Sequence, residues 1–310
     1  MRRTLVIGPA ILTLVVLGAC SGAAGTSGSA QQTPSPNATA SSSVDPSETA
    51  ATPSPTAPSV EPDLTLAVLG DFGAANEAQQ DVADRMCRYR RNHPFDHVVT
   101  TGDNIYPDGH PARFESAFFE PYRCLMDEGV DFHATLGNHD IVHDGGRSEL
   151  SEPAFGLPRR NYVFRRLGLR LVLANSNALN YDWLKEATRA RAADRWTIVA
   201  FHHPVFSAGP HGSTPGFRPS LPRLFRRRGV DLVLNGHDHL YLATKELRGI
   251  RYVVTGGGGA TLYACEPRWF VEFCISRHHF LYIVLFADRI EVRALPVKGR
   301  AFHKFSTDGG

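Results

Sequence analysis

Short apolar runs recur along the chain, many of them ending at a glycine or a polar cluster, and they limit its fold more than any other feature. Several are nearly continuous in Val, Leu and Ile, which is typical of strands covered on both faces. Segments with helical spacing lie between them, so we expect an α/β fold with right-handed crossovers. The predicted strands cover residues 64–70, 97–102, 131–137, 169–175, 196–202, 230–236, 252–259 and 280–286.

The helical patterns and the last strands complete this outline. The strands predicted at 252–256, 280–286 and 289–295 are closer together than the others, which favours antiparallel pairing among them. The predicted helices cover residues 76–92, 111–128, 182–193 and 219–228.

Five of the predicted strands end in residues of the kinds that bind metal ions. Ligands in open α/β sheets gather beyond the carboxyl ends of the strands, so these five loops should meet at one rim. A glycine before the polar group, present in four of the five, suits a sharp turn and a close approach of the backbone to a ligand. The five stretches are Gly70-Asp71-Phe72-Gly73, Gly102-Asp103-Asn104-Ile105-Tyr106, Gly137-Asn138-His139-Asp140, Val199-Ala200-Phe201-His202-His203 and Gly236-His237-Asp238-His239.

Carboxylate, imidazole, amide oxygen and phenolate together suit iron, zinc or manganese. Seven such groups are too many for one tetrahedral ion, whereas two ions that share a bridging carboxylate would use them all. Two neighbouring ions can hold the attacking and the leaving oxygen of a displacement at phosphorus. The candidate metal ligands are Asp71, Asp103, Tyr106, Asn138, His202, His237 and His239.

In their order and spacing these motifs resemble those of the calcineurin-like metallophosphoesterases. Tyr106, three residues after Asp103, narrows the resemblance to the purple acid phosphatases. Residues 181–185 and 207–212 also resemble the small, mammalian-type tartrate-resistant acid phosphatases. The likeness extends over residues 64–260 and implies a four-layer αββα sandwich with mixed β-sheets.

The resemblance implies a division of the ligands between two ions. A ferric ion would be held by Asp71, Tyr106 and His239. A divalent ion, which would be iron, zinc or manganese, would be held by Asn138, His202 and His237. Asp103 would bridge the two ions.

The same resemblance implies hydrolysis of phosphomonoesters by a metal-bound hydroxide at mildly acidic pH. His139 should donate to a phosphate oxygen or to the leaving group, and Asp140 should orient it. His211 is a second candidate acid near the leaving group. His203 directly follows a ligand, and neighbours in a strand point to opposite faces, so it reaches substrate only if its loop turns it there.

Two other functions fit the same sequence. The metals do not choose between monoesters and diesters, and the sequence does not define the pocket around the leaving group, so a phosphodiesterase or nucleotide hydrolase is one alternative. A non-catalytic surface binding protein that retains the fold is the other. The oligomeric state is not defined by the sequence.

Residues 1–19 have the pattern of a secretory signal peptide. Arg2 and Arg3 precede an apolar run at 5–17, and small residues lead to Cys20. The cysteine makes the segment resemble a bacterial lipoprotein signal, which predicts an exported protein tethered to the cell membrane by a lipid on that residue. An ordinary cleaved signal with an unrelated cysteine is the alternative.

Residues 20–62 are rich in Ser, Thr, Ala, Pro and Gly, and this composition predicts a disordered linker. We therefore expect one catalytic domain at residues 63–310, long enough for a substantial core. The formal charge of +2 falls to near zero when the signal is removed, so nothing indicates nucleic acid as a partner. The expected partners are a small phosphorylated substrate and the membrane.

Four cysteines remain after Cys20, and an even number in an exported protein suggests disulfides. Three pairings are possible. The shortest loop joins Cys265 to Cys274 and leaves Cys87 with Cys124, while free buried thiols remain the alternative.

Overall fold

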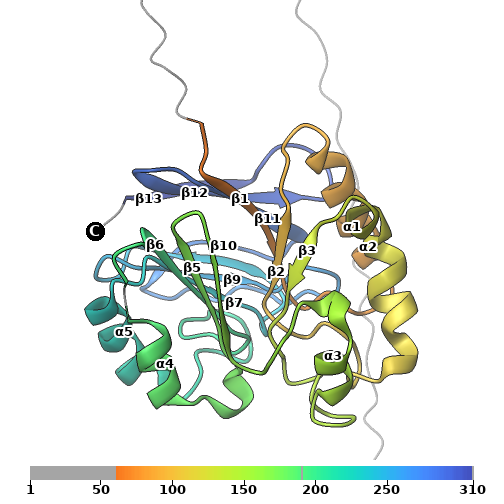
Figure 1. Cartoon of the computed structure of the whole chain (residues 1–310), viewed down its shortest axis with the longest axis horizontal. Coiled ribbons are helices and arrows are strands. Elements are labelled where there is room, and N and C mark those ends of the chain that lie inside the picture. Colours follow the sequence, from red (N-terminus) through yellow and green to blue (C-terminus); the bar gives the residue numbers. More distant parts are fainter. Residues whose placement is uncertain (1–60, 190, 309–310) are drawn as a thin grey trace, which may run out of the picture. The chain divides into compact units, whose positions relative to one another are not determined.

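The computed structural model describes residues 61–189 and 191–308, which form two β-sheets flanked by helices (Figure 1). The order of strands in the first sheet is β13 (His303–Asp308), β12 (Arg289–Pro296), β11 (His279–Leu285), β1 (Leu64–Leu69), β2 (His97–Thr100) and β3 (Asp131–His133). The order in the second is β10 (Val271–Ile275), β8 (Tyr241–Thr244), β9 (Arg251–Thr255), β7 (Leu232–Asn235), β6 (Trp196–Ala200), β5 (Leu169–Leu173) and β4 (Tyr162–Arg166).

Both sheets are mixed: the first is parallel in one half and antiparallel in the other, and the second has a parallel centre with antiparallel edges. In the first sheet β1, β2 and β3 run parallel, and β11, β12 and β13 pair antiparallel. In the second sheet β5, β6, β7 and β9 run parallel, and β4, β8 and β10 pair antiparallel. The carboxyl ends of the parallel strands in each sheet therefore share one edge, where a site can form.

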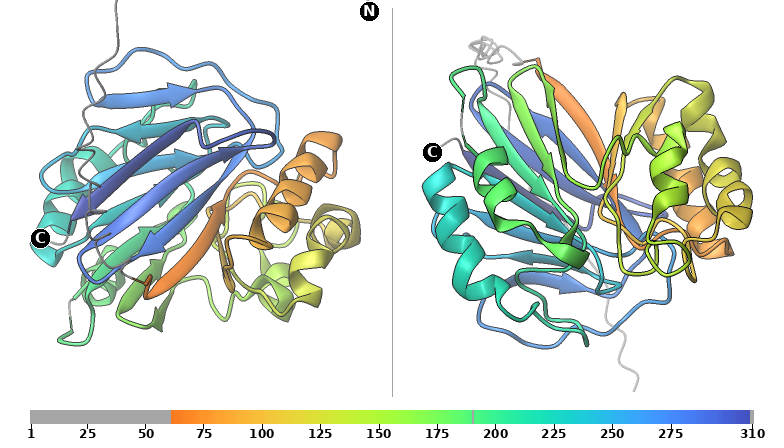
Figure 2. Two further views of the ribbon diagram at one scale, coloured as in Figure 1. Left: turned by 90° about the horizontal axis from the view of Figure 1, so that it is seen from above. Right: turned by 60° about the horizontal axis from the view of Figure 1, so that its bottom comes forward.

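The main helices lie on the outside of this pair of sheets. Figures 1 and 2 show α1 and α2 beside the first sheet and α4 and α5 beside the second. The predicted four-layer αββα sandwich is thus confirmed. The helices are α1 (Glu77–Arg90), α2 (Glu120–Asp127), α3 (Arg147–Ser151), α4 (Tyr181–Ala187) and α5 (Phe217–Arg228).

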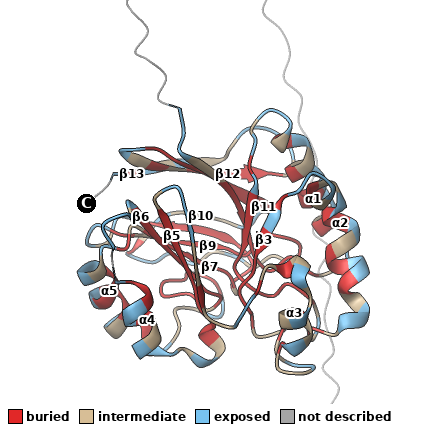
Figure 3. Ribbon diagram, viewed as in Figure 1, coloured by how far each residue is buried: buried red, intermediate tan, exposed pale blue. Residues whose placement is uncertain are grey.

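Alternation along each central strand builds two apolar cores. In β5, Leu171 joins the larger core, which includes Met86 of α1, while Val172 joins a second core with residues of α4 and α5. Burial is continuous along the central strands and one-sided on the helices, as Figure 3 shows. Strands buried on both faces explain why the central apolar runs were nearly continuous in sequence.

Two predicted helices differ from the structure. The segment predicted at 111–128 is a 3₁₀ turn, a π-helical turn at Glu115–Phe119 and then α2. Pro121 has no amide hydrogen to continue a regular ladder, and the wider turn precedes it. The helix predicted at 182–193 ends at Ala187, because the Thr188 hydroxyl donates to the Leu184 carbonyl and Asp194 accepts from the Arg191 amide in the turn that follows.

The pairing expected of the last strands is wrong in part. β11 and β12 are antiparallel neighbours, but β9 lies in the other sheet, parallel to β7. The strand predicted at 131–137 stops at His133, where the chain turns toward the site. Sequence patterns also missed α3 and the strands β4, β8, β10 and β13.

Of the three possible cysteine pairings, the structure has the one that contains the shortest loop. Cys265 pairs with Cys274, and Cys87 in α1 pairs with Cys124 in α2. The signal peptide, Cys20 and nearly all of the linker lie outside the described residues. Within residues 61–189 and 191–308, the helices are all too short or too polar to cross a bilayer.

Candidate metal centre

The strand ends predicted to converge do meet at one point between the two sheets. Asp71 and Asp103 follow β1 and β2 of the first sheet, and His202 and His239 follow β6 and β7 of the second. The chain can bring these turns so close only because glycines line them. A Cβ on Gly137 would lie 2.1 Å from Asp103 Oδ1, so any larger residue there would push the two loops apart.

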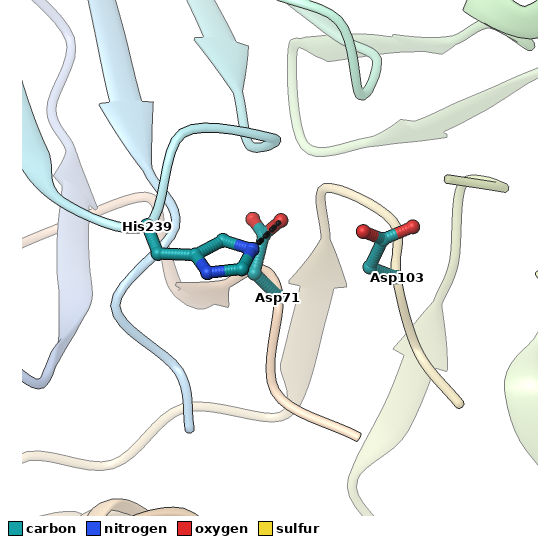
Figure 4. A group of neighbouring side chains, drawn as sticks. All are labelled: Asp71, Asp103 and His239. Atoms are coloured by element: carbon teal, nitrogen blue, oxygen red, sulfur yellow. Dashed lines mark ion pairs between the residues drawn. The ribbon is translucent and has the colours of Figure 1, made fainter. Parts of the chain in front are cut away.

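One half of the centre consists of Asp71, Asp103, His239 and Tyr106. One ligand atom from each of the first three lies within 4.8 Å of the others, and Figure 4 shows the His239 ring facing the Asp71 carboxylate. The Tyr106 hydroxyl is 3.0 Å from Asp103 Oδ2, 3.1 Å from His239 Nε2 and 3.4 Å from Asp71 Oδ1. The phenol oxygen thus completes a compact group of oxygen and nitrogen ligands.

The other half consists of Asn138, His202 and His237. His202 Nε2 is 3.0 Å from Asn138 Oδ1 and 3.2 Å from His237 Nδ1. The same nitrogen is 3.4 Å from Asp103 Oδ2. Asp103 therefore lies between the two halves, close to ligand atoms of both.

Backbone carbonyl groups set the ring orientation of two histidines. His202 Nδ1 is 2.9 Å from the Thr101 carbonyl oxygen, and His239 Nδ1 is 2.7 Å from that of Thr261. Because a carbonyl oxygen only accepts, each Nδ1 carries the proton and each Nε2 presents a lone pair to the cluster. This is the arrangement that imidazole ligands need.

The electrostatics of the cluster call for cations. Burial and the neighbouring charge of Asp103 raise the pKa of Asp71 well above its usual value. Burial, followed by the charges of Asp71 and Asp103, raises the pKa of Tyr106. Burial lowers the pKa of His202 and that of His237, the latter to about 2, so both imidazoles are neutral. Two buried carboxylates among neutral histidines, with no Lys or Arg paired to them among the described residues, fit bound metal ions.

His139 lies at the edge of this cluster. Its amide donates to Asp103 Oδ1 at 2.9 Å, and its Nδ1 is 2.6 Å from the Pro107 carbonyl oxygen. The carbonyl oxygen can only accept, so Nδ1 carries a proton. The ring centroid is 4.5 Å from that of Tyr106, and His139 is half-buried.

The expectation that Asp140 orients the His139 ring is wrong, because the Pro107 carbonyl does so. Asp140 is fully buried, and its carboxylate accepts from the amides of Asn104, Ile105 and Gly137. It thereby joins the loop that carries Asp103 to the loop that carries Asn138. Burial and the charge of Asp103 raise the pKa of Asp140 to about 7.

The turn that carries His211 is hydrogen-bonded to Asp238, which follows β7 of the second sheet. The Asp238 carboxylate accepts from the His211 amide at 3.0 Å and from the Ser207 hydroxyl. The centroid of the His211 ring is 4.4 Å from that of the His237 ring, and the two ring planes are tilted by 32°. Asp238 thus holds the turn that carries His211.

Sequence reasoning missed several supporting residues. The Tyr263 ring stacks on the His239 ring at 4.3 Å, from a loop that carried no motif. Asn104 is buried inside the second motif and donates to Asp140 and to Glu149 of α3. Asn104 could have been found from its position in the Gly-Asp-Asn-Ile-Tyr motif. Tyr263 and Glu149 lie in no motif, so no sequence pattern indicated them.

Comparison with known proteins agrees with this geometry. The family model of the calcineurin-like phosphoesterases matches residues 64–241, and the chain belongs to that family. It is 27% identical to purple acid phosphatase 17 of Arabidopsis thaliana over 232 residues, which cover 63% of this chain and 68% of the relative. It is 25% identical to tartrate-resistant acid phosphatase type 5 of Mus musculus over 239 residues, 64% of this chain and 73% of the relative.

The fold also matches a solved structure. Purple acid phosphatase PPD1 from yellow lupin seeds aligns with a TM-score of 0.69 and 16% identity, covering 80% of this chain and 55% of that one. With purple acid phosphatases among its homologues, the chain is a hydrolase that acts on phosphoric esters. Its relatives imply a dinuclear metal site, and the residues that meet here fit one.

Proposed function

We propose that this protein is a dinuclear-metal acid phosphatase that hydrolyses phosphomonoesters outside the cell membrane, to which a lipid on Cys20 tethers it. The observation that carries the proposal is the meeting of oxygen and nitrogen ligands from both sheets, with the Tyr106 hydroxyl among them. Most phosphoesterase chemistry needs only the carboxylates and imidazoles. A tyrosine in the cluster favours a ferric ion beside a divalent one.

The division of ligands follows the two halves of the centre. Asp71, Tyr106 and His239 would hold Fe(III), and Asn138, His202 and His237 would hold iron, zinc or manganese. Asp103 would contact both ions. When bound, the ions would lower the pKa of a water molecule and hold the phosphate oxygens.

Side chains around the ions would orient the substrate and donate protons to it. His139 is fixed by Asp103 and Pro107, and with a second proton on Nε2 its ring can donate to a phosphate oxygen or the leaving group. His211, whose ring lies beside that of His237, is the second candidate donor. Asp140 keeps the Asp103 and Asn138 loops together.

The proposed preference for monoesters has its own test, because the metals of such a centre do not choose between monoesters and diesters. The alternative is a phosphodiesterase or nucleotide hydrolase on the same centre. Turnover of a nitrophenyl monoester against the corresponding bis ester separates the two. Faster turnover of the bis ester would move the assignment to the diesterases.

The place of action is tested in cells. We expect the protein in the membrane fraction and exposed to an added protease on the outer side. A Cys20→Ser variant should be released or remain unprocessed, because it lacks the thiol that receives the lipid. A variant distributed like the parent protein would exclude the lipid anchor.

The first test of the metal centre is a visible absorption spectrum with metal content measured on the same sample. A phenolate bound to Fe(III) produces a charge-transfer band, so we expect a pink to purple protein that holds two metal ions. The band should vanish in Tyr106→Phe. Two metal ions without a band under oxidising conditions would remove Tyr106 from iron ligation.

A further inference from the structure

A histidine outside the motif ligands is anchored beside the metal centre by a serine. His203 Nδ1 is 2.9 Å from the Ser176 hydroxyl oxygen, and the His203 amide donates to that same oxygen at 3.0 Å. Ser176 is buried in the 3₁₀ turn that follows β5, and His203 follows β6. Side chain and backbone of one histidine are therefore both fixed by one hydroxyl.

The two contacts allow two tautomers of the His203 ring, because the Ser176 hydroxyl has one hydrogen and two lone pairs. The oxygen accepts from the His203 amide, and its own hydrogen can donate to Nδ1. In that arrangement Nδ1 accepts and Nε2 carries the hydrogen of the neutral ring. No hydrogen bond of Nε2 occurs among the described residues, and this nitrogen remains available as a donor.

The ring lies on the side of the centre assigned to the divalent ion. Its centroid is 4.6 Å from that of His237 and 5.1 Å from that of His202. The same turn also supports the third strand end, because Asn177 donates to the Gly137 carbonyl oxygen at 3.0 Å, directly before Asn138. Ser176 therefore belongs to a turn that supports both sides of this half of the centre.

We propose that His203 is an additional phosphate-binding residue, whose Nε2 hydrogen meets a phosphate oxygen on the divalent-ion side and whose tautomer is set by Ser176. The inference rests on the proposed function, since it deepens the way the same centre holds its substrate. Ser176 acts through His203 and is a positioning residue. His139 then approaches the phosphate group from the loop after β3, and His203 and His211 approach it from the loop between β6 and α5.

Paired substitutions at position 203 separate the distal donor from the serine contact. In His203→Gln the amide nitrogen reaches the place of Nε2, whereas in His203→Asn it reaches only the place of Nδ1. Inorganic phosphate is the probe, with its affinity measured by calorimetry on metal-loaded protein and its inhibition constant measured in turnover. We expect His203→Asn to weaken phosphate binding and to raise KM by about 10- to 100-fold, the range for a hydrogen bond to a charged group.

The other variants complete the pattern. His203→Gln should retain most of the affinity, and Ser176→Ala should fall between the two, because its ring keeps the donor but loses its fixed direction. In the metal-free protein, the ¹⁵N shifts of His203 should report the Nε2–H tautomer. His303→Asn is the matched control, because the Tyr241 hydroxyl contacts His303 Nδ1 at 2.8 Å in β13, and this variant should bind phosphate normally.

Each outcome decides the proposal. Equal phosphate affinity in His203→Asn and the parent protein, or an Nδ1–H tautomer, overturns it. Loss of metal from His203→Asn would assign His203 to the support of its ligand neighbours and also overturns it. If phosphate binds, His203→Asn weakens it and no ester is hydrolysed, the inference stands and the proposed function fails. If esters are hydrolysed and phosphate binding does not depend on His203, the proposed function stands and the inference fails.

Discussion

Three candidate ligands have a backbone conformation that residues other than glycine seldom adopt. The φ angles are 57° at Asp71, 53° at Asp103 and 73° at His237. Each such residue costs on the order of 1–3 kcal/mol and persists only where its surroundings hold it. Here the His237 amide donates to both oxygens of Asp71, at 3.0 Å each, so a strand end of one sheet holds a carboxylate of the other.

His139 gives the clearest test among single residues. His139→Ala removes a donor but leaves all seven candidate ligands, and the methyl side chain keeps the amide that bonds to Asp103. We expect metal content to stay the same and turnover to fall about 10²–10⁴-fold. His143→Ala, in the same loop, is the control and should turn over normally. Equal activity in both variants would remove His139 from the mechanism.

Glu149 allows a prediction about pH in the metal-free protein. Burial, followed by the charge of Asp140, raises the pKa of Glu149 well above its usual value of about 4.5. Above that pH the native state binds more protons than the unfolded chain, so the contribution of Glu149 to stability falls as pH rises. Glu149→Gln carries no such charge. The free energy of unfolding of the parent protein should therefore decline relative to this variant as pH rises above about 4.5.

Urea unfolding of the two metal-free proteins at several pH values between 4 and 8 measures this difference. Glu152→Gln is the matched control, since Glu152 lies three residues away and is half-exposed. A constant difference between the parent protein and Glu149→Gln would mean that Glu149 is not held protonated by its surroundings.

At the scale of elements, the sequence predicted the central strands and the loops beyond them better than the edges. The strands β1, β6 and β7 are buried on both faces and end in glycine or histidine motifs. The apolar pattern of each strand and the residues that follow it therefore indicate the same boundary. β10 and β13 lie at the edges with mixed, half-exposed side chains, and their patterns do not differ from those of loops. The sequence also could not reveal Glu149, because its role depends on which loop α3 contacts.

We predict that one disulfide contributes more to stability and the other more to substrate binding. Cys87–Cys124 joins α1 to α2 across a sequence separation of 37, and Cys265–Cys274 closes a loop with a separation of 9 that begins two residues after Tyr263, in the same segment between β9 and β10. Loop entropy predicts a loss of about 4 kcal/mol of stability for removing the first and about 2–3 kcal/mol for the second. The second should nevertheless raise KM more, because that segment contacts His239.

Double alanine variants of each pair, with unfolding by denaturant and steady-state kinetics, test this prediction. Each variant is the control for the other. Equal effects of both variants on KM would mean that the disulfide at Cys265 does not support the loop beside His239.

At the scale of the whole molecule, the centre joins two separately hydrogen-bonded sheets. Asp71, Asp103, Tyr106 and Asn138 come from the first sheet, and the three histidines come from the second. The motifs predicted that these loops would meet, but no local pattern could show that they belong to different sheets. That division depends on strand pairing between distant segments, such as β1 with β11, which carries no signal in either strand alone.

Because the ions would bind ligands of both sheets only in the folded protein, their removal should lower global stability. A ligand at 100 times its dissociation constant contributes about 2.7 kcal/mol, which in a domain of this size corresponds to a rise in Tm of roughly 5–10 °C. We expect such a rise when metal is added to metal-free protein, measured by thermal unfolding. The rise should shrink in Asp103→Asn, which weakens the contact shared by both halves, and persist in Asp96→Asn, an exposed carboxylate just before β2. Equal Tm values with and without metal would mean that the centre does not join the sheets, and that the carboxylates are accommodated without cations.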